Sequence, residues 1–391
     1  MDDRTPAERS GGSPPRVLLV GPLPGARWRS ISRYAGEIRA HEVLTGVAMT
    51  TVEAPWWNPL SMLAGAQRRW WEQPGVGSAT RGGFEVVHLT DQALGHHVDR
   101  FSSCATLVTC HDMMPWIIPR YFANRAEGII KRKLLRHSIR GMLSADHILC
   151  VSRTTANDLV RAFNFDPERV SVVPNVIADA FQPAPEAEPR LRAEAIMLNS
   201  GPRLLTVGHN GPYKNHEWLI RAMAEPCLAG ARLLRVGAQL TGKQRALATD
   251  LGVASRIDEL GHVDDATLAG LYNSCSVLAQ PSLYEGFGIP VVEAMACGLP
   301  VVCSDGGALP EVVGGAARIV PLESSHRGAE LATALAEVID DAVLRSSLRA
   351  SGLERARRFR PTVVMPELGA VYCAIAAGRR DRALTTGQVG R

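Results

Sequence analysis

Two glutamates, Glu285 and Glu293, flank a glycine-rich turn in the stretch YEGFGIPVVEAMACG. The preceding SVLAQPS is apolar and strand-like, and PVVEAMACG predicts a short buried helix with Pro290 at its first position and Gly298 at its end. A turn between a strand and a helix aims free backbone N–H groups and the positive end of a helix dipole at one spot, which suits a phosphate. The two carboxylates would then serve a neutral partner, rich in hydroxyls, beside that phosphate.

The same carboxylates could instead form the acid/base pair of a glycosidase. Eight residues of helix would separate them by ~12 Å, beyond the ~5–9.5 Å that glycosidases use. A folded turn would shorten that distance, so the spacing disfavours a glycosidase, and the phosphate-like turn disfavours it further. A glycine turn with two solvated glutamates is the remaining alternative.

Two further motifs follow predicted strands. VGHNGPYKNH comes after RLLT and precedes a helix expected near Asn215 or His216, so Lys214 would add a point charge for a diphosphate. The alternative is an ordinary surface lysine. His111 follows the strand pattern ATLVTC, at the carboxyl end of that strand, where a core histidine is the alternative to a functional one.

The elements that position these motifs alternate between strand and helix, which argues for parallel α/β sheets. Strand patterns are RVLLV, FEVVHL, ATLVTC, HILCVS and VSVVP, then, after the proline-rich linker APEAEPRLRAEAIMLNSGP, RLLTVG, ARLLRVG, SVLAQP, PVVCSD and ARIVP. We therefore expect two doubly wound, Rossmann-like domains, residues 1–178 and 179–360, with a terminal helix at about 361–391 that packs back on the first. Ligands of such sheets bind at the carboxyl ends of the strands.

The bulk properties exclude several classes of protein. A net charge of +4 over 391 residues is no nucleic-acid footprint, and no apolar run approaches the ~20 residues that span a bilayer. The opening MDDRTPAERSGGSPP lacks the apolar core of a signal peptide. Eight scattered cysteines without a C-x-x-C pair predict buried free thiols in a reducing cytosol, so we expect a cytoplasmic protein.

No metal site is expected, because His96–His97 has no acidic or thiol partner at ligand spacing and reads as a helix surface pair. The basic segment 120–140 has apolar residues near helical spacing. It predicts either a helix with a solvated charged face or a peripheral contact with anionic lipid at the inner face of the membrane. The solvated face is favoured by about two to one.

The donor-site stretch PSLYEGFGIPVVEAMACGLPVVCSD closely resembles the signature of the retaining nucleotide-sugar glycosyltransferases of family 4, which have the GT-B fold. The resemblance also covers LLTVGHNGPYKNHEWLIRA, LGHVDDATLAGLYNSCSV, VTCHDMMPW, VSRTTANDL and VVPNV, and so spans most of residues 84–321. The two glutamates alone would be weak evidence, but their spacing within this context is a specific signal.

The resemblance implies a role for each candidate residue. Glu293 would contact the ribose hydroxyls of the nucleotide, and Glu285 those of the transferred sugar. His111 would lie in the cleft against the sugar or the acceptor, without a required general-base role. The remaining donor contacts would come from Lys214 and from backbone groups at Gly208, Gly286, Phe287, Gly288 and Ile289.

The sequence departs from the family at two places. Tyr213–Lys214 stands where Arg-Lys or Glu-Lys is common, and the turn GPLPGARWRS lacks the usual Gly-Gly pair. A second phosphate cation is therefore missing from its usual place, and Arg27 or Arg29 could supply it.

The resemblance implies a hexosyltransferase, with mannose the favoured sugar, that needs no metal or other cofactor. The first domain would bind a glycan, lipid-linked or small-molecule acceptor, and the second the nucleotide-sugar donor. The alternative is a nonenzymatic nucleotide-sugar or glycan-binding protein on the same fold.

Overall fold

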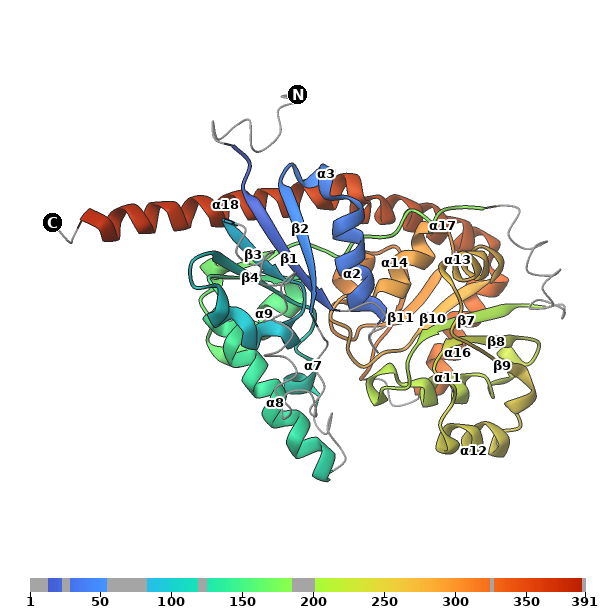
Figure 1. Cartoon of the computed structure of the whole chain (residues 1–391). Coiled ribbons are helices and arrows are strands. Elements are labelled where there is room, and N and C mark those ends of the chain that lie inside the picture. Colours follow the sequence, from blue (N-terminus) through green and yellow to red (C-terminus); the bar gives the residue numbers. More distant parts are fainter. Residues whose placement is uncertain are drawn as a thin grey trace. The chain divides into compact units, whose positions relative to one another are not determined.

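The computed structural model describes residues 13–22, 29–54, 83–118, 125–184, 201–323 and 327–388. The chain divides into two compact units (Figure 1). Unit 1 comprises Met1–Val176 with Pro361–Arg391, and unit 2 comprises Ile177–Arg360, where the sequence predicted boundaries after residues 178 and 360. The two parallel α/β sheets that the strand patterns predicted are both present, one in each unit.

Unit 1 is built on six parallel strands in the order β2-β1-β3-β4-β5-β6. They are β1 (Arg16–Pro22), β2 (Ala48–Ala54), β3 (Val86–Leu89), β4 (Ala105–Cys110), β5 (His147–Cys150) and β6 (Val170–Val172). The interior strands β3 and β4 are buried throughout, which is why their sequences are mainly apolar. The sequence analysis missed β2, because this edge strand, AMTTVEA, mixes polar and apolar residues and buries only Val52 among those whose burial is described.

Helices cover both faces of this sheet. Successive side chains of β1 point to opposite faces and so belong to two different cores. Leu18 and Val20 pack in the core that contains Ile139 and Met142, whereas Val17 and Leu19 pack in the core that contains residues of the terminal helix. The helices are α2 (Arg29–Ala40), α3 (Glu42–Thr45), η1 (Gln92–Phe101), α7 (Met114–Ile117), α8 (Arg125–Ser144), α9 (Arg153–Phe163), η2 (Pro167–Arg169) and α18 (Pro361–Gln388).

The terminal helix α18 belongs to unit 1 although 184 residues of unit 2 precede it (Figure 1, red). Val364, Leu368 and Tyr372 are each at most 1% exposed in the unit 1 core. Gly369 lies against α3 so closely that an added Cβ would stand 1.9 Å from the Thr45 carbonyl oxygen. The helix is therefore an integral part of this unit's core.

Unit 2 repeats the plan with six parallel strands in the order β12-β11-β10-β7-β8-β9. They are β7 (Arg203–Gly208), β8 (Arg232–Gly237), β9 (Ile257–Gly261), β10 (Val277–Gln280), β11 (Val301–Ser304) and β12 (Arg318–Val320). The sequence analysis missed β9, the edge strand IDELG, because none of its residues is fully buried. The carboxyl ends of all six strands share one edge of the sheet, as parallel pairing requires.

The helices of unit 2 include the one predicted after the glycine turn. It is α14 (Ile289–Ala296), which starts at Ile289, so that Pro290 takes the second helical position and not the first. Gly298 ends the segment with a φ of 77°, a conformation that favours glycine. The other helices are η3 (Pro212–Lys214), α11 (His216–Ala222), η4 (Pro226–Leu228), α12 (Gly242–Asp250), η5 (Ala254–Arg256), α13 (Asp265–Ser274), α15 (Leu309–Val313), α16 (Arg327–Asp340), α17 (Ala342–Ala356) and η6 (Arg357–Phe359).

Two expectations about the chain as a whole can be compared with the structure. All eight cysteines are free thiols, and five of them are buried. One helical stretch among the described residues, Ala342–Arg379, is long and apolar enough to cross a membrane by length and composition alone. Since its second half contributes to the unit 1 core, this is weak evidence for a membrane span.

Candidate active site

The best-defined polar site lies at the carboxyl edge of the unit 2 sheet, where Lys214 meets Glu285. The Lys214 ammonium lies 2.7 Å from Glu285 Oε1, and each side chain is 9% exposed. Lys214 ends the η3 turn after β7, and Glu285 lies in the turn after β10. The strands β7 and β10 are neighbours in the sheet, so residues 71 positions apart form one buried ion pair.

Three donors converge on a single oxygen of Glu285. Besides Lys214, Gln280 Nε2 donates to Oε1 over 2.8 Å and Ser282 Oγ over 2.6 Å. Burial alone would raise the pKa of Glu285, but the Lys214 charge and the three hydrogen bonds outweigh burial and lower it. Glu285 is thus ionised at neutral pH. Its Oε2 makes no hydrogen bond to any described residue and is the oxygen left to accept one from a hydroxyl.

The glycine turn that follows Glu285 leads into α14 with its amides available. Gly288 has a φ of 97°, and an added Cβ would stand 2.8 Å from Leu309 Cδ2, so a larger residue does not fit. Within the described part of the chain, the amides of Phe287, Gly288 and Ile289 donate no backbone hydrogen bond. Such unpaired amides at a helix N-terminus are suited to bind an anion. Phe287 is anchored through its ring, 5.5 Å from that of Phe359.

Gly208, the last residue of β7, lets the Lys214 side chain lie against the backbone. An added Cβ would stand 3.3 Å from Lys214 Cε. The structure therefore brings together three of the predicted donor residues, Gly208, Lys214 and Glu285, in one cluster. The alternative of an ordinary surface lysine is wrong, because Lys214 is buried and paired.

The second glutamate of the motif, Glu293, is 3% exposed on α14. Tyr272 on α13 donates its hydroxyl hydrogen to Glu293 Oε2 over 2.9 Å. Glu293 is thus a buried side chain held by a hydrogen bond. The alternative of a glycine turn with two solvated glutamates does not describe it. Its role toward a ribose stays a prediction.

His111 lies in unit 1, directly after β4, and its hydrogen bonds fix its tautomer. Its Nε2 lies 2.8 Å from the Thr90 carbonyl oxygen, which only accepts, so Nε2 carries the hydrogen. Its backbone N–H donates to Gln92 Oε1 over 2.6 Å. Burial lowers the pKa of His111, against smaller opposing effects of Asp91 and the Thr90 bond. His111 is a neutral imidazole whose Nδ1 lone pair bonds to no described residue.

A buried network behind His111 reaches the terminal helix. His88 on β3 joins Tyr372 Oη to Thr109 Oγ1, each over 2.7 Å, and Thr109 in turn contacts Tyr34 Oη over 3.2 Å. The Tyr34 ring packs edge-on against that of His111, with centroids 4.9 Å apart. Burial lowers the pKa of His88 to about 3, so the whole network is uncharged at neutral pH.

Some predictions fall outside the described residues or remain open. Arg27 lies outside the described residues, and the side chain of Arg29 is not described. The same holds for the start of the basic segment 120–140, so membrane contact there stays a prediction. Among the described residues, no three His, Cys, Asp or Glu side chains form a metal-type cluster. His97 is 2% exposed, so the expectation of a helix surface pair was wrong for that residue.

The sequence analysis missed four polar residues at the unit 2 edge: Gln280 and Ser282, which hold Glu285, and Asn210 and Arg235, which are paired with each other. For Arg235 and Gln280 the sequence did contain a usable indication, because each is a charged or amide residue inside an otherwise apolar strand pattern, RLLRVG and SVLAQP. Such residues are rarely buried without a specific partner.

The two parallel α/β units have the GT-B fold found in glycosyltransferases. Sucrose-phosphate synthase from Thermosynechococcus elongatus superposes with a TM-score of 0.74 over 93% of this chain and 100% of its own, at 19% identity. HepE from Anabaena, solved with UDP and glucose, superposes with a TM-score of 0.69 over 92% of this chain and 99% of its own, at 18% identity. At such identities the likeness establishes the fold alone.

Comparison of sequences adds two family models. The model described as glycosyl transferases group 1 matches residues 201–341, and the model described as glycosyltransferase family 4 matches residues 28–181. The two matches together cover most of both units, so each unit carries a glycosyltransferase domain.

Two curated relatives illustrate the range of the family. The MMP alpha-(1->4)-mannosyltransferase of Mycolicibacterium hassiacum is 34% identical over 49% of this chain and 45% of its own length. The O-antigen chain mannosyltransferase B of Escherichia coli is 29% identical over 70% of both chains. The chain thus spans less than half the length of the first relative, as it does for the D-inositol 3-phosphate glycosyltransferase of Mycobacteroides abscessus.

Proposed function

We propose that the protein is a retaining glycosyltransferase that moves a hexose from a nucleotide diphosphate sugar to a hydroxyl of a glycan, lipid-linked or small-molecule acceptor. The observation that carries the proposal is the buried Lys214–Glu285 pair beside the unpaired amides of the glycine turn. A cation and free amides suit a diphosphate, and an ionised carboxylate with one open oxygen suits a sugar hydroxyl.

The proposed reaction breaks the bond between the anomeric carbon and the diphosphate oxygen and forms one to the acceptor oxygen on the same face. Negative charge grows on the leaving diphosphate, where Lys214 and the amides of Phe287, Gly288 and Ile289 would stabilise it. Such fixed donors usually make the largest contribution to catalysis. The leaving phosphate oxygen would take the acceptor's proton, so no protein base is needed.

The two glutamates and His111 would handle neutral groups. Glu285 Oε2 would accept a hydrogen bond from a hydroxyl of the transferred sugar, and Glu293 would accept from the ribose. His111 is neutral with its Nδ1 lone pair available, so it would accept a hydrogen bond from a hydroxyl and not supply a positive charge.

Mannose is the sugar we propose first, because two of the relatives are mannosyltransferases by name. The resemblance of the HD, VSRTTANDL and YKN segments favours a guanine nucleotide as the carrier of this sugar. Because HepE was solved with UDP and glucose, a uridine nucleotide is the first alternative. No metal or other cofactor is proposed.

The proposal is tested by incubating the protein with GDP-mannose, UDP-glucose and other nucleotide sugars and measuring release of the nucleoside diphosphate. We expect slow hydrolysis of one donor, faster release with an acceptor, and an α-linked product from an α-linked donor. Binding of a nucleotide sugar without turnover for any acceptor class would favour the nonenzymatic alternative. Inversion at the anomeric carbon would refute the retaining mechanism.

A further inference from the structure

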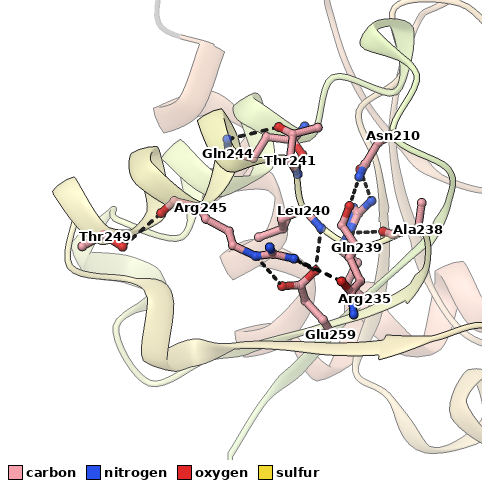
Figure 2. Close-up of polar contacts among 10 residues, drawn as sticks. All are labelled: Asn210, Arg235, Ala238, Gln239, Leu240, Thr241, Gln244, Arg245, Thr249 and Glu259. Carbon is pink, nitrogen blue, oxygen red and sulfur yellow. Dashed lines mark hydrogen bonds and ion pairs between the residues drawn. The ribbon is translucent and has the colours of Figure 1, made fainter.

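Arg235, in the middle of the apolar strand β8, is the most deeply buried cation at the carboxyl edge of the unit 2 sheet. The residue is 2% exposed. Its Nε donates to the Ala238 carbonyl oxygen over 3.0 Å, and its Nη2 donates to Asn210 Oδ1 (Figure 2). Its Nη1 is buried without any hydrogen-bond partner.

No described carboxylate is hydrogen-bonded to Arg235, although the charge of Glu259, its cross-strand neighbour on β9, partly opposes the effect of burial on the arginine. Among the described residues, Arg235 has no ion-pair partner. The carboxylate on the neighbouring strand β9, Glu259, instead accepts from Arg245 and from the Leu240 amide (Figure 2). Burial lowers the pKa of Arg235 only to about 10, so it is cationic at neutral pH. A buried cation without a bonded anion is costly, and an anionic ligand nearby would offset that cost.

The other cations that the structure describes at this edge are already neutralised. Lys214 is paired with Glu285. His209 and His216 are neutral, since burial lowers their pKa values to about 4 and about 3, and both feel the charges of Lys214 and Arg235. A diphosphate carries two negative charges or more, so a cation without a bonded anion, near the net-neutral Lys214–Glu285 pair, would offset part of that charge.

Asn210 connects Arg235 to the edge of the site. The asparagine is half-buried in the loop after β7, and its amide nitrogen donates to the Gln239 carbonyl oxygen in the loop after β8 (Figure 2). Because Arg235 binds Oδ1, the Nδ2 side of the amide faces away from the arginine. The arginine thereby fixes the orientation of the Asn210 amide group. It also holds the loop after β8 through its hydrogen bond to the Ala238 carbonyl oxygen.

We propose that Arg235 is the second cation of the donor diphosphate site, acting as a positioning residue. Its buried charge attracts the diphosphate, and its hydrogen bond orients the Asn210 amide. One N–H of that amide binds the Gln239 carbonyl oxygen, and the other would donate to a phosphate oxygen. Arg27 and Arg29 are then not needed for this purpose. The inference rests on the proposed function, because it assumes that unit 2 binds a nucleoside diphosphate.

The first test measures the affinity of Arg235→Gln for GDP and UDP, and for the corresponding monophosphates, by calorimetry. We expect the diphosphate affinity to fall about tenfold or more, as for loss of a hydrogen bond to a charged group, and the monophosphate affinity to fall less. Arg235→Lys should restore part of the loss. The matched control is Arg232→Gln on the same strand, whose arginine is paired with Asp258 and should not affect either affinity.

A second variant separates positioning from folding. Asn210→Asp gives Arg235 a bonded carboxylate, so it should raise the melting temperature while lowering diphosphate affinity by about tenfold or more. In the Arg235→Gln background the rise in melting temperature should disappear. A merely structural role would move stability and affinity in the same direction.

The outcomes distinguish this inference from the proposed function. If the wild-type protein binds a nucleoside diphosphate and Arg235→Gln binds it within twofold of wild type, the role of Arg235 is refuted and the proposed function stands. If Arg235→Gln does not fold, Asn210→Asp decides, and unchanged diphosphate affinity in that variant refutes the role. If the wild-type protein binds no nucleoside diphosphate, the proposed function itself fails.

Discussion

The carboxyl edges of the two sheets bury different kinds of polar groups. In unit 2 the edge holds charged groups: the Lys214–Glu285 pair and Arg235, whose Nη1 has no hydrogen-bond partner, beside the buried carboxyl of Glu293. In unit 1 the edge holds mainly neutral hydrogen-bonding groups, namely His111 and, behind it, the His88–Thr109 pair. The one buried carboxyl described there, Asp91, caps the helix η1. Both edges come from the same parallel plan.

The difference indicates a division of labour within one fold plan. Buried charges are costly and persist where they serve a charged ligand or a charge that develops during reaction. Neutral imidazoles and hydroxyls suit neutral hydroxyl groups. We therefore expect unit 2 to carry the diphosphate chemistry and unit 1 to recognise hydroxyls of the acceptor or sugar.

Breaking the unit 2 ion pair should have the largest effect. Lys214→Ala leaves Glu285 buried and unpaired, which typically costs ~3–5 kcal/mol of stability. Turnover in the folded fraction should fall by a factor of ~100–1000, more than the Michaelis constant for the donor rises. Urea unfolding and steady-state kinetics measure the two effects.

Two variants serve as controls for Lys214. Lys243→Ala removes an exposed pair with Glu217, in which the lysine is 82% exposed, and should cost less than ~1 kcal/mol. Lys214→Met combined with Glu285→Gln removes both charges and should recover most of the stability without the activity. Near-wild-type turnover in folded Lys214→Ala would mean that the diphosphate charge is handled elsewhere.

Removing Glu293 should weaken donor binding with little effect on unit 1. Loss of a charged acceptor for the ribose hydroxyls is worth ~1.5–3 kcal/mol, about 10–150-fold in nucleotide affinity. Tyr272→Phe removes the hydroxyl that holds Glu293 Oε2 and should weaken binding less. Calorimetry with the nucleoside diphosphate is the measurement, and unchanged affinity in folded Glu293→Ala would remove this residue from the ribose site.

The neutral network of unit 1 should make the protein sensitive to acid. The pKa of His88 is about 3 when folded against about 6.5 when unfolded. Between these values the unfolded state binds a proton that the folded state excludes, so stability falls as the pH falls. The slope is ~1.4 kcal/mol per pH unit for this histidine.

His88→Gln should remove that contribution, because glutamine can hydrogen-bond without titrating. The free energy of unfolding, measured in urea at pH 7, 6 and 5, should then fall less steeply than in wild type. An unchanged slope would show that His88 is already protonated in the folded protein, contrary to its burial.

Chelation should have the smallest effect. We propose that Lys214, Arg235 and backbone amides stabilise the negative charge of the diphosphate. Donor hydrolysis should therefore be unchanged in excess EDTA. Loss of activity with rescue by magnesium or manganese would refute this prediction and move the diphosphate charge from protein groups to a metal.

The strands, turns and helices that depend on a local sequence pattern could be predicted from the sequence alone. Buried parallel strands such as β4 are mainly apolar in sequence, and the glutamate–glycine motif located the turn before α14. The edge strands β2 and β9 were not predicted, because strands that are only partly buried at the edge of a sheet lack that apolar pattern.

Which polar residues contact one another depends on the tertiary structure and could not be predicted from the sequence. Glu285 and Lys214 are 71 residues apart, and His88 and Tyr372 are 284 apart. Whether Lys214 is exposed or paired, and whether Arg235 lies in water or in the core, depends on strand order and on the neighbours of each strand. Burial fixes the partners and pKa values of such groups, and burial is a property of the assembled sheet that no short stretch of sequence contains.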